Sequence, residues 1–263
     1  MSDALLWPTI FWSGVLGVLG LVFGSFIATV AIRWPARRSA LSGRSECDGC
    51  GRTLTALELV PLVSWIGLRG LCRTCDARIG WSHPLTEALG LAIGVVAGLL
   101  APGLAGAAGA VFGWLLLAAG AVDLAAFRLP NPVTLALAVT GLASGAIGLS
   151  PPLFDRACGG IAGFTALWLV ATGYRAIRDR DGLGGGDAKL FGAIGLWLGW
   201  RALPVVLLIA CVLGLAWALL RRMKRDDRLP LGTLLAVGAF ALWLWSVTAG
   251  CGTSSACLTL PPS

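Results

Sequence analysis

Four cysteines in two Cys-x-x-Cys pairs are the first residues whose types and spacing point to chemistry. The pairs are Cys47 with Cys50 and Cys72 with Cys75, and 21 residues separate them. Each pair can hold two thiolates on one tight turn, and two such turns complete the tetrahedral site of a structural zinc ion. Four protein ligands leave no open coordination position, so the metal is expected to be structural rather than catalytic. The alternative is four loop cysteines without metal.

Two aspartates mark the ends of strongly apolar stretches, where an ionisable group is costly and is therefore a candidate for function. Asp123 closes one stretch, and Asp187 opens another after Gly184, Gly185 and Gly186. Two neighbouring carboxylates share a proton, so one can activate water while the other protonates a carbonyl or a leaving amine. The glycines would let a substrate backbone approach Asp187. The alternative is a pair of solvated carboxylates at a membrane surface.

The elements that position these groups follow from the composition. Of 263 residues, 57% are hydrophobic and 13% charged, with 37 glycines. A soluble globule of this size cannot bury so much apolar surface, and the composition also excludes a disordered chain or a disulfide scaffold. We therefore predict an all-α integral membrane protein with about eight transmembrane helices and a small cytoplasmic zinc-binding insert. The predicted spans are 10–32, 84–100, 104–122, 132–149, 158–174, 187–200, 202–220 and 231–249.

Two glycine pairs have the spacing that lets membrane helices approach closely. They are Gly20 with Gly24 and Gly141 with Gly145. Background glycine content explains any single pair of this kind equally well, so the spacing alone leaves both interpretations open.

The distribution of basic residues predicts the orientation. With the N-terminus outside, 18 of the 20 Lys and Arg residues fall on inner segments, and Arg156 and Arg201 fall on the other side. The positive-inside rule then places both termini outside the cytoplasm. The expected parts are a first transmembrane span (1–32), a cytoplasmic four-cysteine zinc insert (33–83), a seven-helix membrane body (84–250) and an extracytoplasmic tail (251–263).

The tail carries two cysteines, Cys251 and Cys257. The predicted orientation places them on an oxidising side of the membrane, where disulfides form and persist. They are candidates for a disulfide, and two free thiols are the alternative.

In their order along the chain, these motifs resemble the type IV prepilin peptidases (prepilin leader peptidase/N-methyltransferase), a family of GxGD-type intramembrane aspartic proteases. Two positions depart from the family pattern: Glu58-Leu59 stands where Asp-Asn is usual, and His83 stands where an aromatic residue is often found. The matching segments are Gly24-Ser25-Phe26, the double Cys-x-x-Cys insert, Val60 to Trp65, Leu68-Arg69-Gly70, Pro84 to Glu87, Leu129-Pro130-Asn131, Gly184 to Lys189, and Leu229 to Gly232.

The resemblance implies that Asp123 and Asp187 are catalytic and that Gly184, Gly186 and Lys189 support the catalytic loop. It implies cleavage of the basic leader of type IV prepilins or type II secretion pseudopilins, at the cytoplasmic side of the bacterial inner membrane. It also implies N-methylation of the new N-terminus with S-adenosyl-L-methionine as methyl donor. No glycine-rich fingerprint identifies residues that bind this donor. The expected partners are these substrates and the lipid bilayer, with no nucleic acid.

Two other functions fit part of the sequence. One is a proton-coupled membrane transporter that uses the aspartates as a relay. Carboxylates at helix ends on one membrane face disfavour it, because a relay needs a path through the bilayer. The other is a zinc-bearing membrane scaffold without catalysis. Leader cleavage separates the peptidase from both.

Overall fold

The structure is a computed structural model of the chain, and it describes residues 3–36, 38–40, 44–47, 49–179, 183–224 and 227–250. The tail 251–263, with the disulfide predicted between Cys251 and Cys257, lies outside the described residues. The chain divides into two compact units, residues 1–110 and 111–263. Each unit is described by itself below.

Eight of the described helices correspond one to one to the predicted spans. Six of them are long and apolar enough to cross a membrane, whereas α5 and α7 have only 16 and 14 residues. The structure therefore confirms an all-α, multi-pass membrane protein. The helices are α1 (Asp3–Arg33), α3 (Ser82–Leu100), α4 (Leu104–Ala126), α5 (Asn131–Ala146), α6 (Leu153–Arg178), α7 (Gly185–Leu198), α8 (Leu203–Leu220) and α9 (Leu231–Thr248).

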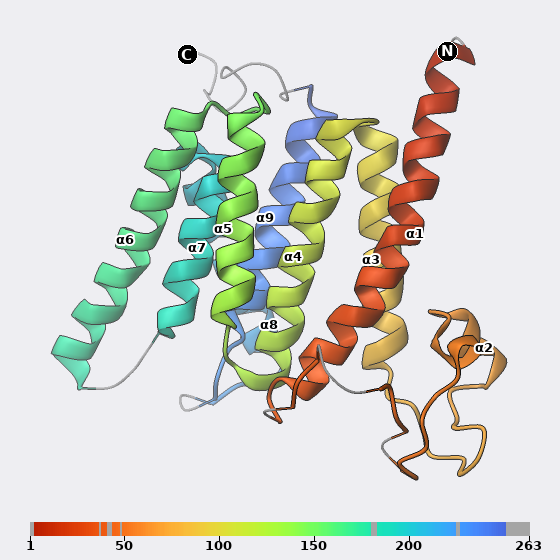
Figure 1. Cartoon of the computed structure of the whole chain (residues 1–263). Helices are drawn as coiled ribbons and strands as arrows, with labels where there is room; N and C mark the ends of the chain where they lie inside the picture. The colour runs from red at the N-terminus through yellow and green to blue at the C-terminus, as the bar shows by residue number, and fades with distance from the viewer. Residues whose placement is uncertain are drawn as a thin grey trace. The chain divides into compact units, whose positions relative to one another are not determined.

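In the first unit, α1 and α3 lie side by side along most of their length (Figure 1). A side chain at Gly20 would collide with the carbonyl of Gly90, and one at Gly24 would lie 2.6 Å from the carbonyl oxygen of Thr86. The first glycine pair thus allows a close helix approach, as its spacing indicated. In the second pair, in α5, Gly141 makes room for the Trp197 side chain and the Leu196 carbonyl of α7, and Gly145 makes room for the Arg156 side chain.

The insert between α1 and α3 contains little regular structure. It holds a 3₁₀ turn, η1 (Ala56–Leu59), the short helix α2 (Val63–Gly67) and two isolated β-bridges. The backbone N–H of Leu62 donates to Glu87 Oε2 at 2.8 Å, which fixes the start of α2 to the second turn of α3. The indoles of Trp65 and Trp81 also pack together, with ring centroids 4.5 Å apart and an interplanar angle of 55°.

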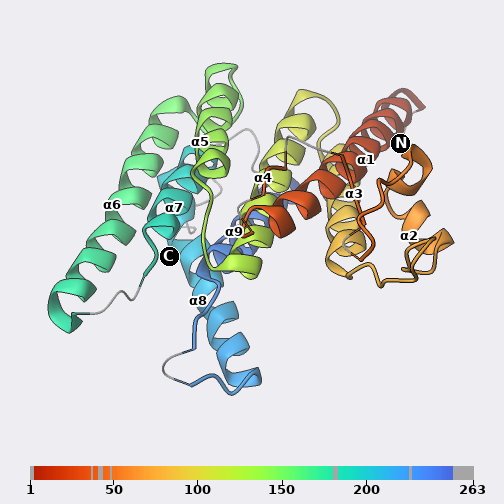
Figure 2. The same cartoon turned by 60° about the horizontal axis from the view of Figure 1, so that its bottom comes forward.

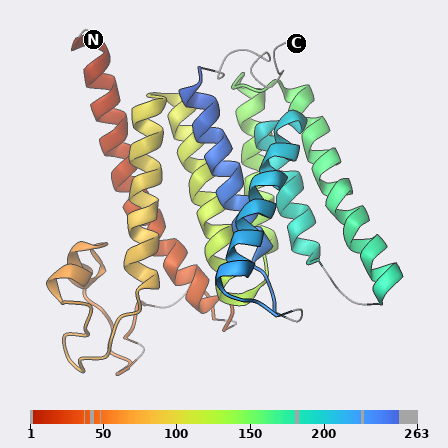
Figure 3. The same ribbon diagram turned by 180° about the vertical axis from the view of Figure 1, so that it is seen from behind.

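In the second unit, α7 is packed between α5 and α6 (Figure 2). Glycines at the α6–α7 contact, Gly159 and Gly195, bring the two backbones together. Trp197 of α7 donates from Nε1 to the carbonyl of Leu137 at 2.7 Å and stacks on Phe112. From the opposite side, Figure 3 shows α8 crossing α9, on which it packs. A short 3₁₀ turn, η2 (Trp200–Ala202), joins α7 to α8.

Arg156 is the largest fully buried side chain of the described residues, with 1% of its surface exposed. The sequence predicted a span that begins at 158, but α6 begins at Leu153, so Arg156 lies inside the helix. A buried guanidinium is tolerated only when its donors are satisfied. Its N–H groups here donate to five carbonyl oxygens in α5, in the α5–α6 connection and near the C-terminal end of α7, those of Gly141, Leu149, Ser150, Pro151 and Leu196.

Candidate functional site

Asp123 lies in the last turns of α4 and is almost completely buried, with 5% of its surface exposed. Its Oδ2 accepts hydrogen bonds from the backbone N–H of Thr233 at 2.9 Å and from Thr233 Oγ1 at 3.3 Å. Thr233 Oγ1 also lies 2.9 Å from the carbonyl oxygen of Gly120, to which it donates. The first turn of α9 is thereby fixed to the end of α4 and sets the orientation of the Asp123 carboxylate.

Asp187 is the third residue of α7 and is half-buried. Its Oδ2 accepts the backbone N–H of Gly184 at 3.2 Å, so the carboxylate caps the start of its own helix. A side chain at position 184 would begin 3.0 Å from that same oxygen. The glycine at 184 therefore keeps the approach to the Asp187 carboxylate free of side-chain atoms.

Leu129, the third residue after α4, lies against the segments that carry the two aspartates. A Cβ at Gly186 would lie 3.0 Å from Leu129 Cβ, and a Cβ at Gly232 would lie 3.0 Å from both Leu129 Cδ1 and Asp123 Oδ2. The end of α4 and the starts of α7 and α9 thus converge on Leu129. This convergence brings together the two aspartates that the sequence singled out.

Lys189 adds a further link at this end of the unit. Its ammonium donates to Asn131 Oδ1 at 2.9 Å, which joins α7 to the first residue of α5. Both side chains are exposed. The segments Leu129-Pro130-Asn131 and Gly184 to Lys189, which are far apart in the sequence, are therefore neighbours at the candidate site.

Such a carboxylate pair can do acid–base chemistry without metal, serine or histidine. If one carboxylate is protonated and the other ionised, the ionised one can deprotonate a water molecule and the protonated one can donate to a carbonyl. Repulsion between the charges of two neighbouring carboxylates favours this singly protonated state. The arrangement is suited to hydrolysis of a peptide bond.

The four cysteines of the insert form a cluster in the first unit, in which all four sulfur atoms lie within 4.8 Å of one another. The Sγ atoms of Cys47 and Cys75 are 3.7 Å apart. Four thiolates at about 2.3 Å from a zinc ion stand about 3.8 Å from one another, so the donor set and its spacing fit tetrahedral zinc. The structure thus brings together the four cysteines expected from the sequence.

Backbone donors around the cluster favour thiolates. The N–H groups of Thr74 and Cys75, with a smaller contribution from the Cys47 thiol, lower the pKa of Cys72 to about 6. The N–H of Gly49 points to Cys47 Sγ at 3.4 Å. A metal ligand must be deprotonated, so these donors prepare the turns for metal binding.

Glu58 is the first of the two residues at which the insert departs from the family pattern, and it has a structural role. Its carboxylate accepts from both terminal nitrogens of Arg52, at 2.6 and 3.2 Å, and from the backbone N–H and hydroxyl of Thr55. These hydrogen bonds, the Arg52 bonds first, lower the pKa of Glu58 to about 2. The pair links the chain after the first cysteine turn to η1.

Sequence reasoning missed three residues that hold these sites. Thr233 directly follows Leu229 to Gly232, one of the segments that resemble the family. Its hydroxyl can donate a hydrogen bond, and this was the one indication of its role in the sequence. Glu87 stood in a matched segment, but nothing in its spacing indicated a bond to the insert. Arg156 was noticed only for its charge. Thr233 and Glu87 bond to partners 110 and 25 residues away, and Arg156 also reaches Leu196, 40 residues away.

Two family models match the chain. The bacterial peptidase A24 N-terminal domain matches residues 18–100, and the type IV leader peptidase family matches residues 110–219. No solved structure shows significant similarity to the chain.

Three curated relatives carry the name prepilin leader peptidase/N-methyltransferase. The protein from Aeromonas salmonicida (strain A449) is 37% identical over 214 residues, which cover 80% of this chain and 74% of the relative. The protein from Burkholderia pseudomallei (strain K96243) is 41% identical over 257 residues, with coverage of 85% and 82%. The protein from Pectobacterium carotovorum subsp. carotovorum is 34% identical over 261 residues, with coverage of 89% and 93%.

Proposed function

The chain belongs to the type IV leader peptidase family, and we propose that it is a membrane aspartic endopeptidase that cleaves the basic leader from type IV prepilins or type II secretion pseudopilins. The observation that carries this proposal is the convergence on Leu129 of the segments that hold Asp123 and Asp187, at one end of the second unit. The names of the relatives support the same reaction.

In the proposed cleavage, the ionised aspartate takes a proton from water while the water oxygen attacks the scissile carbonyl. The other aspartate donates its proton to the carbonyl oxygen. When the tetrahedral diol collapses and its carbon–nitrogen bond breaks, the aspartate that took the water proton donates it to the leaving amine. The other aspartate takes a proton from a diol hydroxyl, so the dyad is again singly protonated, with the proton on its original carboxyl group. Thr233 acts as a positioning residue, because its two donors orient the Asp123 carboxylate.

The second proposed reaction is N-methylation of the amine that cleavage exposes, which the relatives' names support. S-adenosylmethionine supplies an electrophilic methyl group on a sulfonium centre. The amine loses a proton to solvent and attacks this methyl carbon. As the nitrogen–carbon bond forms, the carbon–sulfur bond breaks and its electron pair stays on sulfur.

Zinc at Cys47, Cys50, Cys72 and Cys75 is proposed to be structural. Its four thiolate ligands leave no position for water or substrate, and the insert has little regular structure of its own to hold it together. The metal would therefore support the fold of the insert rather than either reaction directly.

We further propose that the protein lies in the bacterial inner membrane with the insert and the aspartates on the cytoplasmic side. The distribution of the 20 Lys and Arg residues supports this orientation. Lys189 and Arg128, which follow Asp187 and Asp123 by two and five residues, belong to the basic side.

Purified protein in lipid nanodiscs, incubated with a prepilin-type substrate that carries a basic leader, tests the peptidase. We expect cleavage by the unmodified protein and loss of cleavage in Asp123→Asn and Asp187→Asn. Asp155→Asn is the matched control, because Asp155 lies in α6 and its oxygen accepts from Trp200 Nε1, a role that an Asn oxygen retains. Cleavage at the unmodified rate by both dyad variants would refute the proposal.

A further inference from the structure

The insert, which connects two membrane-spanning helices, exposes several large apolar side chains. Val63 and Ile66 stand three residues apart, on one face of α2, and each has 67% of its surface exposed. Trp81, whose indole packs against Trp65 of α2, is 73% exposed. The 3₁₀ turn η1 packs on α2 and adds Leu57, which is 79% exposed. We call Leu57, Val63, Ile66 and Trp81 the apolar surface of the insert.

This exposure is confined to one part of the insert. The second cysteine turn exposes only Arg73, Thr74, Cys75 and Asp76, none of which is a large apolar residue. Single exposed apolar side chains are ordinary, but several on neighbouring short elements indicate a surface that contacts another apolar medium or molecule. The position of the insert decides which of these it is.

The length of α3 sets the level of the membrane in the first unit. At a rise of about 1.5 Å per residue, its 19 residues extend about 28 Å. The hydrocarbon core of a bilayer is about 30 Å thick, so α3 needs its whole length to cross. The first turn of α3, which directly follows Trp81, therefore lies at the boundary between lipid tails and headgroups.

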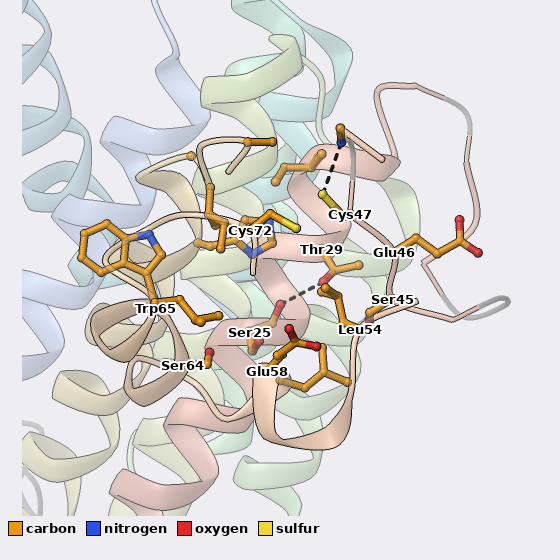
Figure 4. Close-up of a pocket in the computed structure, with 18 of the residues that line it drawn as sticks. Ser25, Thr29, Ser45, Glu46, Cys47, Leu54, Glu58, Ser64, Trp65 and Cys72 are labelled. Carbon is orange, nitrogen blue, oxygen red and sulfur yellow. Dashed lines mark hydrogen bonds between the residues drawn. The ribbon is translucent and has the colours of Figure 1, made fainter. Parts of the chain in front are cut away.

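The insert is attached at this same level. The N–H of Leu62, at the start of α2, donates to Glu87, the sixth residue of α3 and about 8 Å along its axis. On the side of α1, Ser25 and Thr29 line a cavity together with Trp65 of α2 (Figure 4). Helix α2 thus lies beside the ends of two spans and not beyond them, as Figure 1 shows for α3. Its exposed apolar side chains are level with the bilayer boundary.

The charges of the insert favour one kind of bilayer. In the described part of the insert, five exposed arginines stand against two exposed acidic residues, and an anionic leaflet attracts such a basic segment at its surface. Tryptophan is also enriched at membrane–water boundaries, which suits the exposed indole of Trp81. The arginines are Arg38, Arg44, Arg69, Arg73 and Arg78, and the acidic residues are Glu46 and Asp76.

We propose that the apolar surface of the insert is embedded in the headgroup–acyl boundary of an anionic bilayer, on the side where α1 ends and α3 begins. The insert is then a membrane-surface element and not a loop surrounded by water. Transfer of its apolar side chains from water to this boundary supplies the attraction, and the arginines add to it. The proposal goes beyond the proposed function, because neither reaction requires it.

Photo-crosslinking of the full-length protein in nanodiscs tests the proposal. The crosslinking amino acid p-benzoylphenylalanine replaces Ile66 in one variant and Val63 in a second. The nanodiscs contain phosphatidylethanolamine in excess over phosphatidylglycerol, and mass spectrometry identifies every adduct. Two reference variants carry the crosslinker at Leu99, an exposed residue of α3, and at Thr74 in the second cysteine turn. Thermal unfolding checks that each variant folds as the unmodified protein does.

We expect lipid adducts at positions 63 and 66 within about twofold of the yield at position 99 and at least about tenfold above that at position 74, because only an embedded side chain meets lipid continuously. The share of phosphatidylglycerol among these adducts should exceed its share of the nanodisc lipid. Yields at 63 and 66 no higher than at 74 would overturn the proposal, as would adducts with a second copy of the chain or with residues 111–263 in place of lipid. A phosphatidylglycerol share equal to that of the nanodisc would refute the anionic preference.

Discussion

At the scale of single residues, the proposed cleavage depends on carboxylates held by backbone donors. Asp123 is oriented by Thr233, and Asp187 by the N–H of Gly184. Such donors fix a carboxylate without adding a positive charge beside it. The repulsion between the two aspartates is therefore not offset, and it favours protonation of one of them. The geometry explains why a threonine follows Gly232 at the start of α9.

Replacement of Thr233 by valine tests the positioning role. The substitution removes the hydroxyl but keeps the backbone donor and nearly the same volume, so we expect cleavage to fall about fivefold to tenfold, the worth of one hydrogen bond. The loss should appear in kcat rather than KM, and Thr233→Ser should restore it. The control is Thr165→Val, since Thr165 is exposed and bonds only to its own helix. An unchanged kcat in Thr233→Val would show that the backbone donor suffices.

The ion pair of Glu58 with Arg52 predicts a pH dependence of the insert. The pKa of Glu58 falls from an ordinary value of 4.5 to about 2 in the folded insert. A carboxylate with a lowered pKa stabilises the fold fully above its unfolded-state pKa, and this contribution disappears as the pH falls through the folded-state value. The pair should therefore stabilise the insert fully above pH 4.5 and lose its effect towards pH 2.

Amide hydrogen exchange at Thr55, whose N–H donates to Glu58, measures this contribution. We expect Glu58→Gln to lower the protection of this amide at pH 6, and the difference from the unmodified protein to shrink near pH 2. An equal difference at both pH values would mean that charge on Glu58 plays no part.

At the scale of elements, the insert is a short chain segment whose fold is stabilised by three sets of interactions. These are the cysteine cluster, the Arg52–Glu58 pair and the attachment of α2 to α3 through Glu87. Below about 50 residues, a segment rarely buries enough apolar surface to fold on its own core. We therefore expect the insert to respond to metal removal as one cooperative piece.

Changing Cys72 to serine tests this expectation. Cys72 is the buried member of the cluster, and its loss leaves three thiolates. We expect loss of zinc, loss of methyl transfer, and cleavage that is reduced but measurable. Metal analysis and the two activity assays check it, with Cys211→Ser as control because Cys211 lies in α8. Full methylation by a zinc-free protein would contradict the role given to the metal.

The contact between α1 and α3 predicts a strong position dependence along α1. A side chain at Gly20 would meet the Gly90 backbone, whereas a Cβ at Gly14 would meet nothing within 4 Å. Gly20→Val should destabilise the protein by about 1–3 kcal/mol, as overpacking of a tight contact does. Gly14→Val should leave the thermal unfolding midpoint nearly unchanged. Equal midpoints for the two variants would mean that the helices separate at little cost.

At the scale of the whole molecule, the sequence predicts the helices, the cysteine cluster and the aspartate pair. Apolar length alone located the eight helices, and local spacing located the cysteines, because these signals are contained within short segments. The comparisons confirm the family that the motif order resembled. The partners of Arg156, Glu87 and Thr233 could not be predicted, because each bond joins segments whose packing is set by the fold.

The residues of the two proposed reactions lie in different units of the chain. The first unit carries the cysteine cluster, and the second carries both aspartates. Variants in one unit should therefore impair one reaction more than the other. Cys72→Ser should reduce methylation more strongly than cleavage, as end-point mass spectrometry of the substrate can show. Equal losses of both reactions would contradict this division.

The most direct test of the central claim, that Asp123 and Asp187 act as one catalytic dyad, is a comparison of single and double variants. Residues that act as a unit show non-additive losses, because removing either member already disables the pair. We predict that Asp123→Asn, Asp187→Asn and the double variant cleave a prepilin-type substrate at the same residual rate, each at least about a thousandfold below the unmodified protein. Losses that multiply in the double variant, or a single variant that keeps a tenth or more of the activity, would contradict the dyad.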